Sequence, residues 1–307
     1  MDETPIEIHL GVTFDQNYVT HFYALSASIL SNIKSSKPVV HALITGLSNE
    51  QKDGLTRYYS AQGGEINFYL IDLSKVEGFV MTSSLTFATY YRLFFGALLP
   101  QKIERLLYID IDTLVLQDIT ELYFSDLEGH IIGCVYDNYI KTQPLLGITE
   151  EGNYFNAGVM LKDLKRWRSE NISQKVIDYL ETYPHRIKFP DQCAMNGVFL
   201  GNWLHLPYTF NCMYSYIPEA MNRKERDDFI KEISIIHFTL QRPWSMLCRN
   251  RYRYLYFEYL AKTPVKQEHH YSDFSWSNAP KWAKLRIMEL YFDNKWIRSI
   301  WSVFKRR

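Results

Sequence analysis

The chain has 307 residues, of which 47 % are apolar, 16 % aromatic and 22 % charged. This apolar content is too high for a disordered protein, and the length is sufficient for one large domain or two small ones with a sizeable core. The 34 basic and 34 acidic side chains balance. The net positive charge that is typical of nucleic-acid-binding proteins is therefore absent, and no nucleic-acid partner is expected.

Charge is nevertheless distributed unevenly along the chain. Residues 281–307 contain eight basic and two acidic side chains, a local charge of +6 that leaves −6 on residues 1–280. The N-terminal seven residues are acidic and polar, unlike a secretion signal, and no run of about 20 apolar residues predicts a transmembrane helix. The four cysteines lack the spacing of a zinc site, so we expect free thiols in a reducing compartment: Cys134, Cys193, Cys212 and Cys248.

Hydrophobic periodicity predicts a regular order of elements. Apolar residues alternate with others from Ile6 to Phe14, which predicts a strand, and a helix ending near Ile33 follows. The remaining predicted elements are strand Val39–Ile44, helix Asn49–Gln62, strand Ile66–Ile71, helix Thr89–Leu99, strands Arg105–Ile109, Ile131–Val135 and Phe155–Leu161, helices Lys162–Trp167, Ser173–Tyr183 and Gln192–Leu200, and strand Ile233–Phe238. Strands that alternate with helices favour an α/β fold with a mostly parallel sheet and helices on both of its faces.

The C-terminal part has a different character. Pro264–Ser277 is polar and aromatic, and we place there a boundary between a globular domain, residues 1–262, and a tail, residues 263–307. On a helical wheel the apolar residues of Trp296–Phe304 fill one arc and basic residues lie opposite, a pattern typical of helices at a membrane interface. We predict that residues 281–307 contact an anionic membrane surface; the alternative is a helix that packs on the body with a solvated basic face.

The segment Arg105–Val115 is an apolar strand that runs directly into two carboxylates, Asp110 and Asp112. Ligands of open α/β sheets bind beyond the carboxyl ends of the strands. Two acidic oxygens there can hold a divalent cation, which can in turn hold a diphosphate. The pair itself is common by chance, so its position after a buried strand is what favours a metal site over a loop with solvated carboxylates.

Five further segments accompany this acidic pair in a fixed order: Phe14–Tyr18, Thr89–Leu93, Tyr154–Val159, Asp191–Gly197 and His237–Trp244. As a set they resemble glycosyltransferase family 8, which includes bacterial lipopolysaccharide galactosyl- and glucosyltransferases. The resemblance covers roughly residues 6–250. It implies the GT-A nucleotide-sugar-binding fold, so that residues 1–262 would form the catalytic domain, and a UDP-hexose donor.

The resemblance also implies roles for individual residues. The ligands of Mn²⁺, or of Mg²⁺ in its place, would be Asp110, Asp112 and His237. The donor-binding residues would be Asp15, Asn17, Tyr18, Arg92, Asp110 and Arg242. The residues beside the transferred sugar, with catalytic roles, would be Asn156, Asp191 and Gln192. Three positions depart from the family pattern: Leu240 replaces a glycine, Arg242 a lysine and Cys193 an acidic residue.

Together with the basic tail, the resemblance therefore implies a retaining transferase that would move galactose or glucose from UDP to a bacterial surface glycan, such as lipopolysaccharide or lipooligosaccharide, with an α-linkage, at the inner face of the cytoplasmic membrane. One alternative is a metal-dependent phosphohydrolase of the haloacid dehalogenase-like type, in which Asp227 and Asp228 would supply a later acidic pair. Another is a catalytically silent sugar-binding protein. Single residues also have simpler interpretations: His237 as a buried hydrogen-bonded histidine, Asn156 as a turn residue and Asp191 as a helix N-cap.

Overall fold

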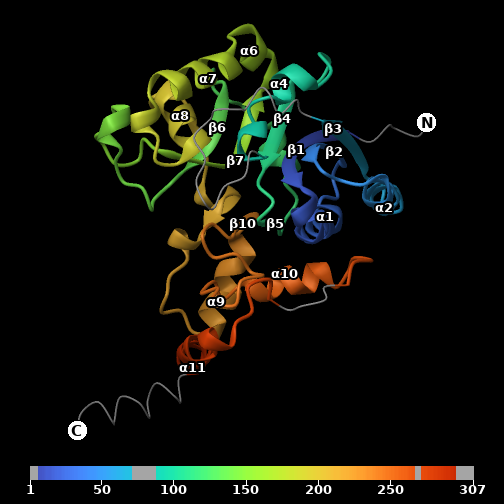
Figure 1. Ribbon diagram of the computed structural model, residues 1–307, viewed down its shortest axis with the longest axis vertical. Helices are drawn as coiled ribbons and strands as arrows, with labels where there is room; N and C mark the ends of the chain where they lie inside the picture. Colours follow the sequence, from blue (N-terminus) through green and yellow to red (C-terminus); the bar gives the residue numbers. More distant parts are fainter. Residues whose placement is uncertain (1–5, 71–87, 267–270, 295–307) are drawn as a thin grey trace.

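The computed structural model describes residues 6–70, 88–266 and 271–294 (Figure 1). In these residues the strands form a seven-stranded sheet, in the order β3-β2-β1-β4-β7-β6-β8, and a three-stranded sheet, in the order β5-β10-β9. The strands are β1 (Glu7–Asp15), β2 (Lys37–Thr45), β3 (Glu65–Leu70), β4 (Arg105–Ile109), β5 (Thr113–Val115), β6 (Ile132–Tyr136), β7 (Phe155–Asp163), β8 (Leu204–His205), β9 (Cys212–Met213) and β10 (Ile235–His237).

The large sheet is mostly parallel. Strand β1 pairs in parallel with β2 and β4, β2 pairs in parallel with β3, and β6 pairs in parallel with β8. Only β7 is reversed, because it is antiparallel to both of its neighbours, β4 and β6. The predicted α/β class is confirmed; the reversal of one central strand is a feature that the sequence pattern did not predict.

Helices cover both faces of this sheet (Figure 1). They are α1 (Val19–Asn32), α2 (Asn49–Ser60), α3 (Ala88–Tyr91), α4 (Phe95–Leu98), α5 (Thr120–Phe124), α6 (Leu164–Ser169), α7 (Ile172–Thr182), α8 (Pro190–Phe199), α9 (Arg223–Phe229), α10 (Arg253–Leu260) and α11 (Ala279–Asp293). Leu10 and Val12 of β1 pack in a core with α1, α2 and α10. Leu106 and Tyr108 of β4 pack in a second core with α3, α4 and α6–α8.

The predicted helix Thr89–Leu99 is interrupted. Helix α3 ends at Tyr91 and α4 begins at Phe95. The carbonyl of Arg92 accepts a hydrogen bond from Lys162 Nζ (2.9 Å), and that of Leu93 accepts one from Ser173 Oγ (2.5 Å). Because side chains take these two carbonyls, the helical hydrogen-bond pattern stops there.

The predicted helix Lys162–Trp167 also begins later than expected. Lys162 belongs to β7, and helix α6 starts at Leu164. Asp163 caps this helix, since its Oδ1 accepts a hydrogen bond from the backbone N–H of Arg166 at 2.9 Å. The N-cap, rather than the apolar periodicity, therefore sets the helix start.

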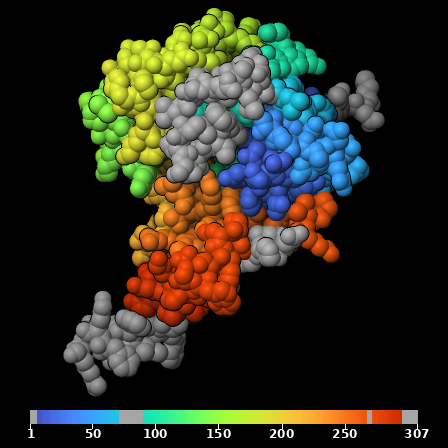
Figure 2. All heavy atoms as spheres, in the orientation of Figure 1, coloured from blue at the N-terminus to red at the C-terminus, as the bar shows by residue number. Residues whose placement is uncertain are grey.

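Helix α11 lies at one end of the molecule, beyond α9 and α10 (Figures 1 and 2). None of its side chains is fully buried. Ion pairs attach it instead: Arg253 Nη1 to Glu289 Oε1 at 2.7 Å, and Arg226 Nη1 to Asp293 Oδ1 at 2.7 Å. The predicted amphipathic arc Trp296–Phe304 lies outside the described residues, and the domain boundary at residue 262 stays a prediction.

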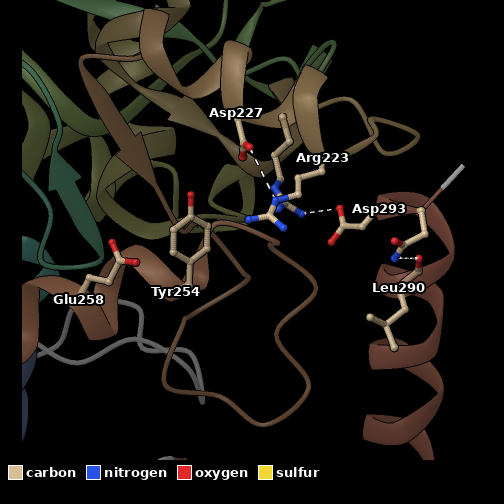
Figure 3. Close-up of a pocket in the computed structure, with 8 residues that line it drawn as sticks. Arg223, Asp227, Tyr254, Glu258, Leu290 and Asp293 are labelled. Atoms are coloured by element: carbon tan, nitrogen blue, oxygen red, sulfur yellow. Dashed lines mark hydrogen bonds and ion pairs between the residues drawn. The ribbon is translucent and has the colours of Figure 1, made fainter.

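Two other features complete the description. A hollow of about 440 Å³ lies among α9, α10 and α11 (Figure 3). Its lining carries charges of both signs, with Arg223 beside Asp227 and Asp293 nearby, and it contains none of the residues predicted for the transferase site. Over the described ranges, no helix has the combination of length and hydropathy required to span a bilayer.

Candidate active site

The two sheets meet at the acidic pair. Asp110 follows β4 of the large sheet, and Asp112 precedes β5 of the small sheet. His237 ends β10 and lies opposite Thr113 in the antiparallel β5–β10 pair. As a result His237 Nε2 is 3.1 Å from Asp112 Oδ1 and 3.9 Å from Asp110 Oδ2. The three side chains each offer a ligand atom, and these atoms all lie within 4.8 Å of one another.

These residues fit a divalent cation. Two carboxylates and an imidazole form a mixed oxygen and nitrogen donor set for a divalent metal ion. Gly158 of β7 lies directly against them: a Cβ at this position would be 2.2 Å from His237 Cε1 and 2.8 Å from Asp110 Oδ2. Only glycine allows the backbone of β7 to approach so closely, so the strand forms one wall of the cluster.

A hydrogen bond at Nδ1 fixes the orientation of the His237 imidazole. Its Nδ1 lies 2.8 Å from Asn211 Oδ1. Because an amide oxygen only accepts hydrogen bonds, Nδ1 carries a proton and Nε2 faces the two aspartates. Burial disfavours the charged ring, but Asp112 outweighs burial and raises the pKa of His237. A metal ion bound at Nε2 requires that this nitrogen be deprotonated.

A chain of side-chain hydrogen bonds continues from Asn211 to the predicted sugar site. Asn211 Nδ2 donates to Asn156 Oδ1 at 3.0 Å, and Asn156 Nδ2 donates to Asp137 Oδ2 at 3.1 Å. Gln192 Nε2 donates to the same Asp137 oxygen at 3.2 Å, and Gln192 Oε1 accepts from the backbone N–H of Ala157 at 3.1 Å. Both amides are therefore held in single orientations.

Asn156 also serves its own strand, since its Oδ1 accepts a hydrogen bond from the backbone N–H of Gly158 at 3.0 Å. The simpler interpretation of Asn156 as a turn residue is only partly correct, because its side chain binds the N–H of Gly158 but the residue lies within strand β7. The same oxygen links β7 to Asn211, however, so the residue has a local role and a role in the network.

Arg92 joins the metal cluster to helix α8. Its Nη2 is 2.9 Å from Asp110 Oδ1, its Nε is 2.9 Å from Asp191 Oδ2, and its Nη1 donates to the carbonyl of Ala157 at 2.7 Å. The N-cap of α8 is Phe189, so the N-cap interpretation of Asp191 is wrong. Burial raises the pKa of Asp191 to about 6, although the positive charge of Arg92 opposes this shift.

The first-strand motif lies at the same edge of the sheet. Asp15 ends β1, and its Oδ1 accepts a hydrogen bond from the backbone N–H of Asn17 at 2.8 Å. This contact fixes the 3-10 turn Gln16–Tyr18 that follows. Tyr18 meets Trp244 edge-to-face, with ring centroids 6.3 Å apart.

Trp244 belongs to the loop after β10 that also carries Arg242. Burial disfavours the ionised form of Asp112, but His237 and, to a lesser degree, the charge of Arg242 outweigh burial and lower the pKa of Asp112. In the same loop Leu240 has a φ of +59°, the left-handed conformation that glycine adopts without strain. The side chain of Leu240 is 77 % exposed. At Leu240 the loop therefore has a backbone conformation that suits glycine. The backbone is strained there because a leucine occupies the position.

The replacement at Cys193 has a different outcome. The side chain is buried in a small apolar cluster, and its Sγ lies 3.3 Å from the hydroxyl of Tyr154. Cys193 is therefore a packing residue rather than a polar group of the site. Its three fellow cysteines are likewise buried and free of disulfides.

Three residues at or near this site are absent from the residues predicted for it. Asn211 carries no pattern of its own and is recognised only by its contacts with His237 and Asn156. Lys162 interrupts an apolar strand, which is a usable signal, although the periodicity places it at the start of the predicted helix Lys162–Trp167. Asp137 is recognisable as a polar residue directly after β6, yet nothing in the sequence connects it to Gln192.

The fold and the cluster together define a class. A mostly parallel sheet whose fourth strand delivers an Asp-x-Asp pair into a small second sheet carrying a histidine is a GT-A fold, the nucleotide-sugar-dependent type of glycosyltransferase. The sequence model of the glycosyl transferase family 8 matches residues 9–248, and the chain belongs to this family. The predicted family and fold are both confirmed.

Several relatives support this assignment. General stress protein A of Bacillus subtilis is 29 % identical over 269 residues, which are 83 % of this chain and 94 % of the relative. A lipopolysaccharide 1,2-glucosyltransferase of Escherichia coli is 28 % identical over 260 residues, 80 % of this chain and 77 % of that protein. Among solved structures, the galactosyltransferase LgtC in complex with donor and acceptor sugar analogues has a TM-score of 0.74 at 24 % identity, over 85 % of this chain and 98 % of LgtC.

The phosphohydrolase alternative is wrong. The family match excludes it, and the geometry agrees, because Asp227 and Asp228 lie in α9. Asp228 pairs there with Lys224 at 2.6 Å and Lys231 at 2.9 Å, at the protein surface. It does not join Asp110 and Asp112.

Proposed function

We propose that this chain transfers galactose or glucose from a UDP-sugar to a bacterial surface glycan of the lipopolysaccharide or lipooligosaccharide type. One observation carries the proposal. The Asp110, Asp112 and His237 cluster and the side-chain amides of Asn156 and Gln192 lie together at one edge of the sheet. Two of its relatives, a lipopolysaccharide 1,2-glucosyltransferase and a galactosyltransferase, support a hexose donor and a glycan acceptor.

The proposed cofactor is Mn²⁺, with Mg²⁺ as a substitute, held by Asp110, Asp112 and His237. When bound, a divalent cation supplies Lewis-acid stabilisation of the negative charge on a leaving diphosphate. Arg242 adds positive charge from the loop after β10. Arg92 forms an ion pair with Asp110 and thereby orients that carboxylate.

At the nucleoside end we assign Asp15, Asn17 and Tyr18 to the uracil and ribose of the donor. The edge contact of Tyr18 with Trp244 connects this motif to the loop of Arg242. A donor that spans both would therefore meet a continuous surface from base to diphosphate. The expected specificity for a UDP-sugar rests on this continuity.

At the sugar end we assign catalytic roles to Asn156, Asp191 and Gln192. The orientation of Gln192 is set by Asp137 and by the backbone of β7, so it offers the sugar a fixed amide. An amide is a poor nucleophile compared with a carboxylate. We propose retention of configuration, so that an α-linked donor gives an α-linked product, which the anomeric coupling in the NMR spectrum of the product would test.

A donor panel tests the activity. Purified protein is incubated with Mn²⁺ and UDP-glucose, UDP-galactose, UDP-N-acetylglucosamine or GDP-mannose, and free nucleotide is measured, with Asp112→Asn as control. Release of UDP from one hexose donor, lost in the control, supports the proposal and identifies the sugar. Absence of both nucleotide release and UDP binding refutes the roles of Asp15, Asp110, Asp112 and His237.

We also propose that the enzyme acts at the inner face of the cytoplasmic membrane, with residues 281–307 on the anionic lipid surface. The described part of this segment supports the idea, because α11 exposes both apolar and basic side chains: Lys281, Lys284, Ile287, Met288 and Leu290. Deletion of residues 281–307 should abolish sedimentation with vesicles that contain phosphatidylglycerol. Unchanged vesicle binding by the truncated protein, shown to be folded by circular dichroism, refutes this part.

A further inference from the structure

Lys162 is a buried cation outside the residues assigned above. It lies in β7, the central reversed strand, opposite Leu106 of β4 and Ile132 of β6. Its side chain is fully buried, at 0 % exposure. Burial, together with the nearby charge of Arg92, lowers its pKa to about 7. Among the described residues no carboxylate forms an ion pair with it, so this position is costly for an ammonium group.

The amine of Lys162 forms a hydrogen bond with one backbone carbonyl and lies near two aromatic rings. Its Nζ donates a hydrogen bond to the carbonyl of Arg92 at 2.9 Å. The same nitrogen lies 4.3 Å from the ring centre of Trp167 and 5.5 Å from that of Tyr108, so two aromatic faces help to stabilise the cation. The guanidinium of Arg92 lies 4.7 Å from the Tyr108 ring centre.

The hydrogen bond from Lys162 to the Arg92 carbonyl stabilises the interruption between helices α3 and α4. In a continuous helix the carbonyl of Arg92 would accept from the N–H four residues later, and its side chain would follow the helical path. Instead Lys162 takes that carbonyl, and Ser173 takes the carbonyl of Leu93. The backbone of Arg92 is thereby fixed at the point from which its guanidinium reaches Asp110 and Asp191, each at 2.9 Å.

We propose that Lys162 is a positioning residue for the transfer reaction, which fixes the backbone of Arg92 and so keeps the guanidinium on Asp110 and Asp191. A purely structural function does not require a cation here, because the surroundings are aromatic and apolar and a methionine would fill the same space. The Arg92 carbonyl requires a hydrogen-bond donor, which Lys162 supplies and a methionine lacks. This inference rests on the proposed glycosyl transfer, although the placement of Arg92 can be measured separately.

The central experiment compares Lys162→Met with Lys165→Met in the full chain. Lys165 is three residues away on α6, with 70 % of its side chain exposed, and serves as the matched control. The first readout is the side-chain Nε–H NMR signal of Arg92, identified as the signal missing from Arg92→Met. We expect Lys162→Met to shift this signal and to speed its exchange with solvent. An unchanged signal overturns the proposal.

The second readout is kinetic. A misplaced Arg92 should lower kcat/KM for donor and acceptor between about 10- and 100-fold in Lys162→Met, and leave Lys165→Met unchanged. In the Arg92→Met background the Lys162→Met substitution should have no further effect, because the group that it positions is gone. Losses that multiply in the double variant, or wild-type kinetics in Lys162→Met, overturn the proposal.

A second variant, Lys162→Gln, completes the experiment. Lys162→Gln keeps an N–H donor without the charge, and it should retain more activity than Lys162→Met; equal losses contradict the assigned hydrogen bond. If Lys162→Met does not fold, Lys162→Gln is compared with the wild type by the same NMR signal. A wild-type chain that turns over no donor refutes the proposed function, whereas the NMR readout still decides the role of Lys162.

Discussion

The close approach of β7 to the metal cluster gives a quantitative prediction for Gly158→Ala. The added Cβ would lie 2.2 Å from His237 Cε1 and 2.8 Å from His237 Nδ1. Since carbon atoms in contact are about 3.5–4.0 Å apart, the ring and the strand must separate by more than about 1 Å. The ring cannot simply turn away, because Asn211 holds its Nδ1 and Asp112 lies at its Nε2.

Such a displacement exceeds the tolerance of a metal site, where ligand distances are defined to about 0.2 Å. We expect the Mn²⁺ affinity of Gly158→Ala to fall by about 100-fold or more, the upper end of what is usual for disturbed ligand support. Isothermal titration with Mn²⁺ measures this directly. Overpacking should also reduce stability by about 1–3 kcal/mol, so thermal unfolding without metal is recorded in parallel.

The matched control is Gly133→Ala in the neighbouring strand β6. There the nearest atoms are the ends of flexible leucine side chains, Leu127 Cδ2 at 3.2 Å and Leu206 Cδ2 at 3.4 Å. This variant should bind Mn²⁺ as the wild type does. Wild-type Mn²⁺ affinity in folded Gly158→Ala would refute the reasoning, since it would mean that His237 does not bind the ion from its observed position.

Three further predictions concern the surroundings of the cluster. Asn211→Leu removes the acceptor for Nδ1 of His237, and Mn²⁺ affinity measured by the same titration should fall about 10- to 100-fold; unchanged affinity would contradict the assigned orientation of the ring. Leu240→Gly relieves the left-handed backbone at φ +59° and should stabilise the fold by up to about 1 kcal/mol in urea unfolding, since the relief exceeds the entropy cost of glycine; a loss of stability would argue against strain. Asp191 has a raised pKa of about 6 in the folded chain, so its ionisation should lower stability as the pH rises from about 4 to 6, by an amount on the order of 2–3 kcal/mol. The difference in unfolding free energy between wild type and Asp191→Asn should change over that window, and a constant difference would refute the assignment.

Local signals were sufficient for much of this fold. The alternation in Ile6–Phe14 and the apolar run before Asp110 each define a strand, and the structure contains both as β1 and β4. The capping box at Ser48, whose side chain and that of Gln51 bond reciprocally, likewise explains why α2 begins where the sequence indicates. These features depend on neighbours within a few residues.

What the sequence could not predict depends on distant contacts. The break after α3 is stabilised by Lys162, 70 residues later in the chain. The reversal of β7 has no signature in residues 155–163, since a buried strand is equally apolar in either direction. For the site, Asp110 and Asp112 were visible as a pair, whereas Asn211 is recognised only through its partners His237 and Asn156, 26 and 55 residues away.

The position of the cluster between the two sheets has a consequence for stability as well as for chemistry. Asp110 directly follows a strand of the large sheet, and His237, 125 residues after Asp112, belongs to the small one. An ion held by both would act as a reversible cross-link that closes a long loop of the chain. Its occupancy would then be coupled to unfolding, with about 2.7 kcal/mol of added stability when the free ion concentration is 100 times its Kd. Thermal denaturation in graded Mn²⁺ would therefore report the affinity of the site without any sugar substrate.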